Sequence, residues 1–374
     1  MNVLHVVTAL EGGGAERFVA LLLPELAKQD ARCSVMTIAP STIPATLHAA
    51  GVDVIEIRRR GRFDAAFLAR MISAMRASRP DVVHTHMHHG TYWGRLAAMA
   101  AGVPAIVRTE HHPCAPQAPI PGTALANRIL NSATAAIVTF SAGQAQYLAR
   151  VEGLPSEKVF VIPNGIRHTE PPLYDDVAAA RARLRIPANR FAVFVLGNLR
   201  HPKNQALAIE AVASLDLPHR RRLQLYLVGD GCDRGALAAL AQARGVDDSV
   251  TFLGYRNDVP AILPAADLLL MPSLSEGMPL ALLEAMSAGV PALSTPWNGA
   301  NDLLEEGRLG VVTADFSPST LAFELRRIID DPAPARAAAQ RAQVVARRDY
   351  AIDAAARLHR ALYDRIVPRA VAAA

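Results

Sequence analysis

The sequence is poor in cysteine and in aromatic residues, and it has no long hydrophobic run. Only three of its 374 residues are cysteine, Cys33, Cys114 and Cys232, and no two of them form a Cys-x-x-Cys pair. Three separated cysteines argue against a disulfide scaffold and indicate a reducing compartment. The start MNVLHVVTALEGGG is predicted as a first strand and not as a signal peptide, and no apolar stretch is long enough to cross a bilayer. These absences predict a cytoplasmic protein.

The sequence also lacks a strong excess of positive or negative charge, since its net charge is only +5. Hydrophobic residues make up 51% and charged residues 20%, which is typical of a globular chain, and the length suggests two domains. No dense basic run is interleaved with aromatics, so a nucleic-acid partner is not predicted. The densest basic region contains Arg58, Arg59, Arg60, Arg62, Arg70 and Arg76. It is either a solvated face or a peripheral contact with an anionic membrane.

Short apolar runs alternate with helix-like segments along the whole chain. We expect strands over residues 3–7, 33–39, 52–57, 81–86, 105–110, 135–141 and 159–164, and then over 191–198, 223–230, 250–255, 266–273, 291–296 and 310–314. Strands that alternate with helices predict parallel sheets covered on both faces. The predicted fold class is therefore α/β, with two Rossmann-like doubly wound parallel-sheet domains. Ligands bind beyond the carboxyl ends of such strands, so an interdomain cleft is the expected binding site.

Residues 1–168 are predicted to form the N-terminal domain and residues 188–348 the C-terminal domain. The segment 169–187 between them contains Pro171 and Pro172 and is predicted as a linker. Residues 349–374 are predicted as a C-terminal helical segment, with the last ordered helix near residues 350–366.

Two unusual strand ends fall in the first half. Glu11 to Arg17 read EGGGAER, and glycines before a helix let a backbone approach a ligand closely. Arg17 stands where the third glycine of a dinucleotide fingerprint would be, so a dehydrogenase is disfavoured; an ordinary tight turn remains an alternative. Arg108 to His112 read RTEHH, where a histidine can form hydrogen bonds in a cleft or simply belong to the core or surface. The nearby HTHMHHG (His84 to Gly90) and Cys114 suggest zinc, but their spacing matches no known zinc pattern, and no metal site is predicted.

A third strand end, GNLRHPKN (Gly197 to Asn204), opens the second half. It brings Arg200 and Lys203 to one turn, which suits a pyrophosphate. The alternative is a pair of solvated loop cations.

The fourth strand end is PSLSEGMPLALLEAMSAGVP (Pro272 to Pro291). Glu276 lies in the loop, Pro279 suits the first turn of a helix, and Gly289 suits its C-terminal cap. Glu284 lies within the apolar helix, where it needs a partner; a ribose diol would serve, and so would a capping N–H or an arginine.

The start of this helix is also suited to phosphate. The N–H groups of Gly277, Met278 and Leu280 lie at this helix start, where they would bind it, and Pro279 has none to give.

These motifs together resemble the retaining glycosyltransferases of the GT-B fold, specifically the family four (group 1) type. EGMPLALLE, with its two glutamates, looks like the signature of that family. GGGAER, RTEHH, IPNGI (Ile162 to Ile166), LVGDG (Leu227 to Gly231) and FLGYRNDVP (Phe252 to Pro260) are similar to its other landmarks, in the same order over most of the chain. Two positions depart from the family pattern. Arg167 stands where an Asp is common, and Asn198 stands where an Arg is common, so Arg200 is expected to supply that charge.

The resemblance implies a role for each matching residue. His111, Lys203 and Glu276 would be catalytic: His111 facing the transferred sugar, Lys203 stabilising the diphosphate leaving group, and Glu276 contacting the sugar hydroxyls. The donor-binding residues would be Gly13, Gly14, Asn198, Arg200, Lys203, Gly277, Met278, Pro279, Leu280 and Glu284. Glu284 would hold the ribose. The N-terminal domain would be the acceptor side, the C-terminal domain the donor side, and the last helix would cross back to the N-terminal domain.

The expected function is retaining, metal-independent transfer of a hexose-type sugar from a nucleotide sugar. A UDP-sugar is favoured as the donor over a GDP-sugar, and a glycan or a lipid-linked molecule is the acceptor, in cell-surface polysaccharide synthesis. No cofactor is expected, and the location is the cytoplasm, with peripheral attachment to the inner face of the membrane as a variant. Two other functions stay open: a nucleotide-sugar epimerase on the same fold, and an inactive sugar-nucleotide-binding protein.

Overall fold

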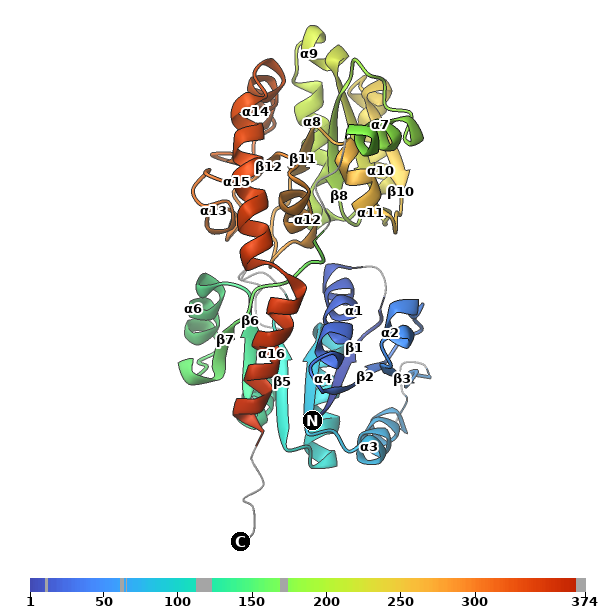
Figure 1. The fold of residues 1–374 in the computed structure, drawn as a ribbon, viewed down its shortest axis with the longest axis vertical. Helices are drawn as coiled ribbons and strands as arrows, with labels where there is room; N and C mark the ends of the chain where they lie inside the picture. The colour runs from blue at the N-terminus through green and yellow to red at the C-terminus, as the bar shows by residue number, and fades with distance from the viewer. Residues whose placement is uncertain (11–12, 61–63, 65, 112–122, 169–173, 368–374) are drawn as a thin grey trace. The chain divides into compact units, whose positions relative to one another are not determined.

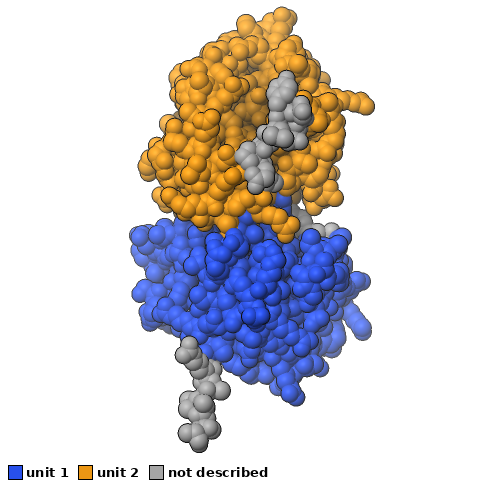
Figure 2. Space-filling model, viewed as in Figure 1, with its two compact units in different colours: residues 1–166, 352–374 blue, residues 167–351 orange. Residues whose placement is uncertain are grey.

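The structure is a computed structural model, and it describes residues 1–10, 13–60, 64, 66–111, 123–168 and 174–367. The chain divides into two compact units. Unit 1 contains residues 1–166 and 352–374, and unit 2 contains residues 167–351 (Figure 2). Each unit is described by itself.

Unit 1 is built on a seven-stranded parallel sheet (Figure 1). Its strands are β1 Asn2–Val7, β2 Arg32–Thr37, β3 Asp53–Glu56, β4 Val82–His86, β5 Ala105–Thr109, β6 Ala136–Thr139 and β7 Val159–Val161. They lie in the order β3-β2-β1-β4-β5-β6-β7. The order reverses between β1 and β4, and this is the point at which doubly wound sheets bind ligands.

Unit 2 is built on a six-stranded parallel sheet. Its strands are β8 Phe191–Leu196, β9 Leu223–Val228, β10 Val250–Gly254, β11 Leu268–Met271, β12 Ala292–Ser294 and β13 Val311–Val312. The order is β10-β9-β8-β11-β12-β13, so the reversal lies between β8 and β11.

Helices connect the strands as parallel pairing requires. Those of unit 1 are α1 Gly14–Ala27, α2 Ala45–Ala49, α3 Ala66–Ser78, α4 His88–Ala101, α5 Thr123–Ala133, α6 Ala142–Val151 and α16 Ile352–Ile366. Those of unit 2 are α7 Tyr174–Arg183, α8 Gln205–Ala213, α9 Leu217–Arg222, α10 Arg234–Ala243, α11 Val259–Ile262, α12 Leu280–Ala288, α13 Ala300–Leu303, α14 Pro318–Asp330 and α15 Ala333–Asp349. Short 3-10 turns add η1 Ser156–Lys158, η2 His201–Lys203, η3 Asp247–Ser249 and η4 Leu263–Ala265.

The core of each unit lies between its sheet and these helices. In unit 2, the strand β9 is buried along its whole length and packs with apolar residues of α8 and α14. In unit 1, residues of β1, β4 and β5 pack against α3 and α4. Strands buried on both faces explain why the apolar runs in the sequence are nearly continuous.

The predicted fold class is confirmed, because every expected strand is present and both sheets are parallel. The unit boundaries differ in detail from the predicted domains. Helix α7 falls inside the range predicted as a linker, yet its Arg181 Nη1 lies 3.0 Å from Asp267 Oδ2 and contacts the carbonyl of Ala265, within unit 2. Pro171 and Pro172 lie outside the described residues. The final helix α16 belongs to unit 1, where it packs against α1.

Candidate functional site

The loops after β8 and β11 bring two of the predicted site residues together at the strand reversal of unit 2. Lys203 ends η2, which follows β8, and Glu276 follows β11. Lys203 Nζ lies 2.7 Å from Oε1 and 2.9 Å from Oε2 of Glu276. Ser273 Oγ donates to the same carboxylate at 2.6 Å. The Glu276 side chain is only 8% exposed and that of Lys203 is 24% exposed, so the pair is largely desolvated.

Two glycines fix the backbone in the elements that carry this pair: Gly229 next to the loop after β8, and Gly289 at the C-terminal end of α12. Gly229 has a φ of +145° and lies against the carbonyl of Gly197, where any Cβ would collide with that oxygen. Gly289 adopts the left-handed conformation, with a φ of +70°, and caps α12, as predicted. These positions need glycine because an L side chain rarely adopts such a φ and because there is no room for a Cβ at Gly229.

Asn198 and Arg200 lie in the same loop as Lys203. The carbonyl of Asn198 accepts a hydrogen bond of 3.0 Å from the buried Gln205 side chain, which fixes the turn. Arg200 is exposed and precedes the first residue of η2. Their predicted donor-binding roles remain predictions.

The start of α12 follows the loop that carries Glu276. Pro279 lies at the N-cap of this nine-residue helix, one position earlier than the first turn for which it was predicted, and Leu280 is its first residue. Gly277 and Met278 precede it and are partly exposed, while Glu284 lies one turn further along and is half-buried. The predicted unit 2 residues therefore follow the carboxyl ends of β8 and β11, where the structure joins Lys203 to Glu276.

The remaining predicted residues lie in unit 1. Gly13 is the N-cap of α1 and Gly14 is its first residue, so both follow β1 at the strand reversal. His111 follows β5, as predicted, and its Nε2 lies 3.0 Å from Nδ1 of His86.

His111 is the outer end of a hydrogen-bonded network of imidazoles that the sequence analysis did not foresee. His86 Nε2 lies 2.9 Å from His5 Nδ1, and His5 Nε2 lies 3.4 Å from the hydroxyl of Tyr363 on α16. The same hydroxyl lies 2.7 Å from His84 Nδ1. His5 and His84 meet because they are register partners on adjacent strands, and His84 and His86 share a face because strand side chains alternate.

Burial keeps the imidazoles of His5, His84 and His86 neutral. Burial, and then the neighbouring His359, lower the pKa of His5 to about 3. The pKa values of His84 and His86 fall well below 6.5, mainly through burial and then through the surrounding histidines. Neutral imidazoles donate at one nitrogen and accept at the other, which suits a hydrogen-bonded chain.

His5, His84 and His86 also form a group that could hold a metal ion, with ligand atoms within 4.8 Å of one another. Both nitrogens of each ring already have protein partners, including Thr109 Oγ1 at 2.7 Å from His84 Nε2. Hydrogen bonding therefore accounts for the cluster. Cys114 lies outside the described residues, and the expectation of no metal stays a prediction.

The predicted basic region is partly neutralised. Arg58 pairs with Glu56 at 2.8 Å and Arg70 with Asp64 at 2.7 Å. Arg62 lies outside the described residues. Among the described helices, none combines the length and the apolar character that a membrane span requires.

The two halves of the chain match two family models. Residues 12–170 match "Glycosyltransferase Family 4" and residues 176–345 match "Glycosyl transferases group 1". A 2-deoxystreptamine glucosyltransferase of Streptomyces kanamyceticus is 27% identical, over 81% of this chain and 82% of that protein. The UDP-Gal:alpha-D-GlcNAc-diphosphoundecaprenol alpha-1,3-galactosyltransferase of Escherichia coli is 28% identical, over 72% and 71%.

Solved structures share the fold of the whole chain. The crystal structure of Anabaena HepE in complex with UDP and glucose has a TM-score of 0.85 at 21% identity, covering 98% of this chain and 100% of that one. WaaG, a glycosyltransferase involved in lipopolysaccharide biosynthesis, has a TM-score of 0.77 at 22% identity, with the same coverage. With one family model on each half, and with this fold throughout, the chain belongs to the group 1 glycosyltransferases of the GT-B fold.

Proposed function

We propose that this glycosyltransferase moves a hexose-type sugar from a nucleotide sugar to a glycan or lipid-linked acceptor in cell-surface polysaccharide synthesis, with retention and without a metal ion. A UDP-sugar is the favoured donor, and a GDP-sugar is the alternative. The name of the E. coli relative, which includes UDP-Gal and a diphosphoundecaprenol acceptor, supports both substrates. The UDP and glucose in the Anabaena structure support the same donor class.

The observation that carries the proposal is the largely desolvated Lys203–Glu276 pair at the strand reversal of unit 2. Both groups have a use in donor binding. The ammonium of Lys203 would contact the diphosphate, and the carboxylate of Glu276 would accept hydrogens from the sugar hydroxyls. Their mutual contact holds both side chains in place until a donor separates them.

Metal-free catalysis follows from the charges that the site supplies. A departing nucleoside diphosphate gains negative charge as the glycosidic bond breaks. Lys203, the exposed Arg200 and the backbone N–H groups before α12 would stabilise that charge in place of a cation. Asn198 would contribute its backbone to the same turn, and Glu284 would hold the ribose hydroxyls.

Retention follows if the acceptor attacks from the face that the leaving group occupies. His111, Gly13 and Gly14 of unit 1 are the residues we assign to the sugar and donor phosphates from the other domain. We assign no carboxylate as a nucleophile, so front-side substitution, with the departing phosphate as the base, is preferred to a covalent intermediate.

The proposed location is the cytoplasm, with peripheral contact at the inner face of the membrane as a variant. Three separated cysteines favour a reducing compartment. Among the cations of the basic region, Arg58 and Arg70 have carboxylate partners, which weakens the electrostatic attraction to an anionic surface.

Slow donor hydrolysis by the purified full-length protein tests the function. UDP-glucose, UDP-galactose, GDP-mannose and ADP-glucose are incubated in turn, with and without EDTA, and nucleoside diphosphate release is measured. We expect release from a UDP-sugar that EDTA leaves unchanged. Proton NMR of the first glucose released should show the α-anomer if the reaction retains configuration.

Lys203→Ala should lower this release by about 100-fold or more, because a fixed cation is lost at the leaving group. Lys28→Ala is the matched control, since Lys28 is exposed, caps the C-terminal end of α1 and pairs there with Glu25. Sugar isomerisation without release would establish an epimerase, and binding without either reaction would establish an inactive protein. Full activity in Lys203→Ala would reject the assigned role of this lysine.

A further inference from the structure

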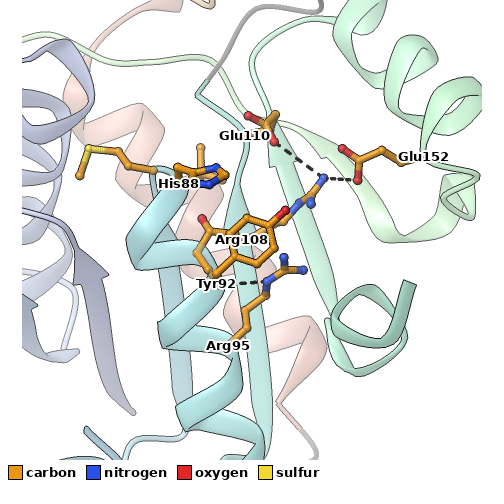
Figure 3. Close-up of a pocket in the computed structure, with 9 residues that line it drawn as sticks. His88, Tyr92, Arg95, Arg108, Glu110 and Glu152 are labelled. Atoms are coloured by element: carbon orange, nitrogen blue, oxygen red, sulfur yellow. Dashed lines mark hydrogen bonds and ion pairs between the residues drawn. The ribbon is translucent and has the colours of Figure 1, made fainter. Parts of the chain in front are cut away.

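Unit 1 contains a small polar pocket at the carboxyl ends of β4 and β5 (Figure 3). Its cavity has a volume of about 100 Å³. The lining includes Tyr92 and Arg95 of α4, Arg108 of β5, Glu110 directly after β5, and Glu152 after α6. A cavity of this size has room for a phosphate-sized group or for a few water molecules.

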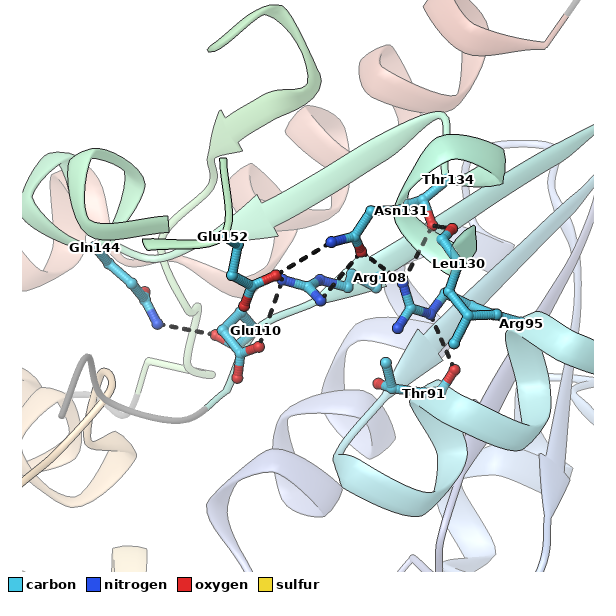
Figure 4. A network of polar contacts seen from close by, with 9 residues as sticks. All are labelled: Thr91, Arg95, Arg108, Glu110, Leu130, Asn131, Thr134, Gln144 and Glu152. Atoms are coloured by element: carbon cyan, nitrogen blue, oxygen red, sulfur yellow. Dashed lines mark hydrogen bonds and ion pairs between the residues drawn. The ribbon is translucent and has the colours of Figure 1, made fainter. Parts of the chain in front are cut away.

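Arg95 is completely buried, yet it has no carboxylate partner within 4.0 Å in the described part of the chain. Its Nε donates to the carbonyl of Thr91 at 3.1 Å, and its Nη1 donates to Asn131 Oδ1 at 2.8 Å (Figure 4). Its Nη2 has no hydrogen-bond partner among the described residues. A buried guanidinium with an unsatisfied N–H is costly, so a ligand that supplies charge and an acceptor would be bound favourably.

Arg108 is different because it has carboxylate partners. Its Nη2 lies 2.7 Å from Glu152 Oε2 and 3.8 Å from Glu110 Oε2. Asn131 also donates to Glu152, at 3.3 Å. Arg108 Nε nevertheless has no partner among the described residues, although it is buried. The pocket is thus lined by two guanidinium groups, each with one nitrogen that lacks a hydrogen-bond partner among the described residues.

The protonation of Arg95 agrees with this environment. Burial, and then the neighbouring Arg108, lower the pKa of Arg95 to about 10. Arg95 therefore still carries its charge at neutral pH. Water molecules in the cavity could accept from these N–H groups. Glu152 and Glu110 offset the charge only from a distance, since no carboxylate lies within 4.0 Å of Arg95 among the described residues.

We propose that the pocket binds the oxyanion of a phosphorylated, hydroxyl-bearing compound, with two oxyanion oxygens accepting from Arg95 Nη2 and Arg108 Nε. Glu110 and Glu152, whose side chains are each 24% exposed, would accept hydrogens from the hydroxyl groups of the same molecule. Their negative charges disfavour a bare multiply charged anion, so the hydroxyl groups are part of the requirement. Resting on the proposed function, this makes the pocket a subsite for a phosphorylated acceptor.

Binding assays without any nucleotide sugar test the pocket. Isothermal titration of the full-length protein uses D-glucose 6-phosphate, inorganic phosphate and D-glucose in turn, in a phosphate-free buffer. We expect D-glucose 6-phosphate to bind tightest. Arg95→Met should weaken its binding by about tenfold or more, the usual effect of losing a charged hydrogen bond. Arg357→Met, which removes an exposed charge paired with Asp353, should leave it unchanged.

A second variant, Glu110→Gln, tests the pocket even if Arg95→Met fails to fold. Glu110→Gln should bind inorganic phosphate about threefold more tightly, because one negative charge is removed beside the anion. Co-sedimentation with phosphatidylcholine vesicles that contain phosphatidylinositol identifies the source of the group. Binding to these vesicles that Arg95→Met loses would assign a lipid headgroup, and binding of D-glucose 6-phosphate alone would assign a soluble acceptor.

Equal D-glucose 6-phosphate binding in the wild-type protein and Arg95→Met would overturn the proposal, as would no binding of any phosphorylated probe to the wild-type protein. Neither result depends on donor turnover. Failure of the hydrolysis assay would remove the proposed function and leave the binding result standing.

Discussion

At the scale of single residues, Glu276 has three hydrogen bonds at its carboxylate, two from Lys203 and one from Ser273. Three hydrogen bonds from two side chains restrict the rotation of this carboxylate. Under the proposed function, the same carboxylate must be ready to receive the hydroxyl groups of a sugar.

Glu276→Gln should lower UDP-sugar hydrolysis by about 100-fold, because the amide removes the negative charge that holds Lys203 and accepts sugar hydroxyls. Ser273→Ala removes only one donor and should lower it by about tenfold or less. Steady-state kinetics of both variants, with melting temperatures as the folding control, make the comparison. A larger loss in Ser273→Ala than in Glu276→Gln would contradict this ranking.

Gly229 is a position where the backbone itself allows no side chain. Gly229→Ala should destabilise the fold by about 2 kcal/mol or more, because the new methyl group meets the carbonyl oxygen of Gly197 at a φ of +145°. Gly235→Ala is the matched control: it lies in α10 with open space around the new methyl group, and should stabilise by about 1 kcal/mol. Thermal and urea unfolding should therefore shift in opposite directions, and a shift of the same sign in both variants would refute the steric explanation.

At the scale of elements, α16 places the Tyr363 side chain against a sheet whose strands all lie within residues 2–161. Tyr363 and His359 lie one turn apart on the same face of this helix, and both are fully buried in unit 1. The hydroxyl of Tyr363 is the point where two branches of the imidazole network meet. If this hydroxyl donates to His84, it must accept from His5 Nε2. His5 Nδ1 then accepts from His86 Nε2, and His86 Nδ1 accepts from His111 Nε2.

Tyr363→Phe should remove this constraint and leave His84 Nδ1 without its partner at 2.7 Å. We expect a loss of about 1–3 kcal/mol in unfolding free energy, the usual effect of an unsatisfied buried group. Nitrogen-15 NMR of the histidines should show one tautomer of His86 in the wild-type protein and a mixture in the variant. Tyr255→Phe, at a 67% exposed position, serves as the control and should change neither quantity. An unchanged histidine spectrum in Tyr363→Phe would mean that this hydroxyl does not orient the network.

At the scale of the whole molecule, the two units should respond differently to acid. Burial lowers the pKa of His359 to about 4, and His5, with a pKa of about 3, His84 and His86 are lowered in the same direction. Below pH 6.5 the unfolded chain binds protons at these residues and the folded chain does not, so stability that is complete above pH 6.5 is lost as the pH falls. In unit 2, hydrogen bonds to its aspartate partners raise the pKa of His219, which has the opposite effect.

Unit 1 should therefore open before unit 2 as the pH falls from about 7 to 5, with each buried histidine contributing up to about 1.4 kcal/mol per pH unit. Hydrogen exchange followed by mass spectrometry resolves the two units. His359→Gln should reduce the acid sensitivity of unit 1, whereas His48→Gln, at an exposed position, should not. Simultaneous opening of both units, or an equal effect of the two variants, would show that the buried histidines do not set this sensitivity.

The local elements and the candidate donor residues could be predicted from the sequence. Apolar runs, glycine caps and proline positions are local signals, so they placed every strand, the end of α12 at Gly289 and the helix near residues 350–366. They also placed Lys203, Glu276 and His111 at strand ends, where parallel sheets collect functional groups. The assignment of these residues to one donor came from the family resemblance.

Only the tertiary structure decided which distant residues meet. His84 and Tyr363 are 279 positions apart in the sequence. No local sequence pattern predicts the strand order that pairs His5 with His84, or the packing of α16 over them. In the sequence Arg95 is like any other helical arginine, but packing buries it with no carboxylate of the described residues within 4.0 Å. Sequence periodicity determines which face of an element is apolar, whereas burial, register and charge compensation depend on the neighbours that folding supplies.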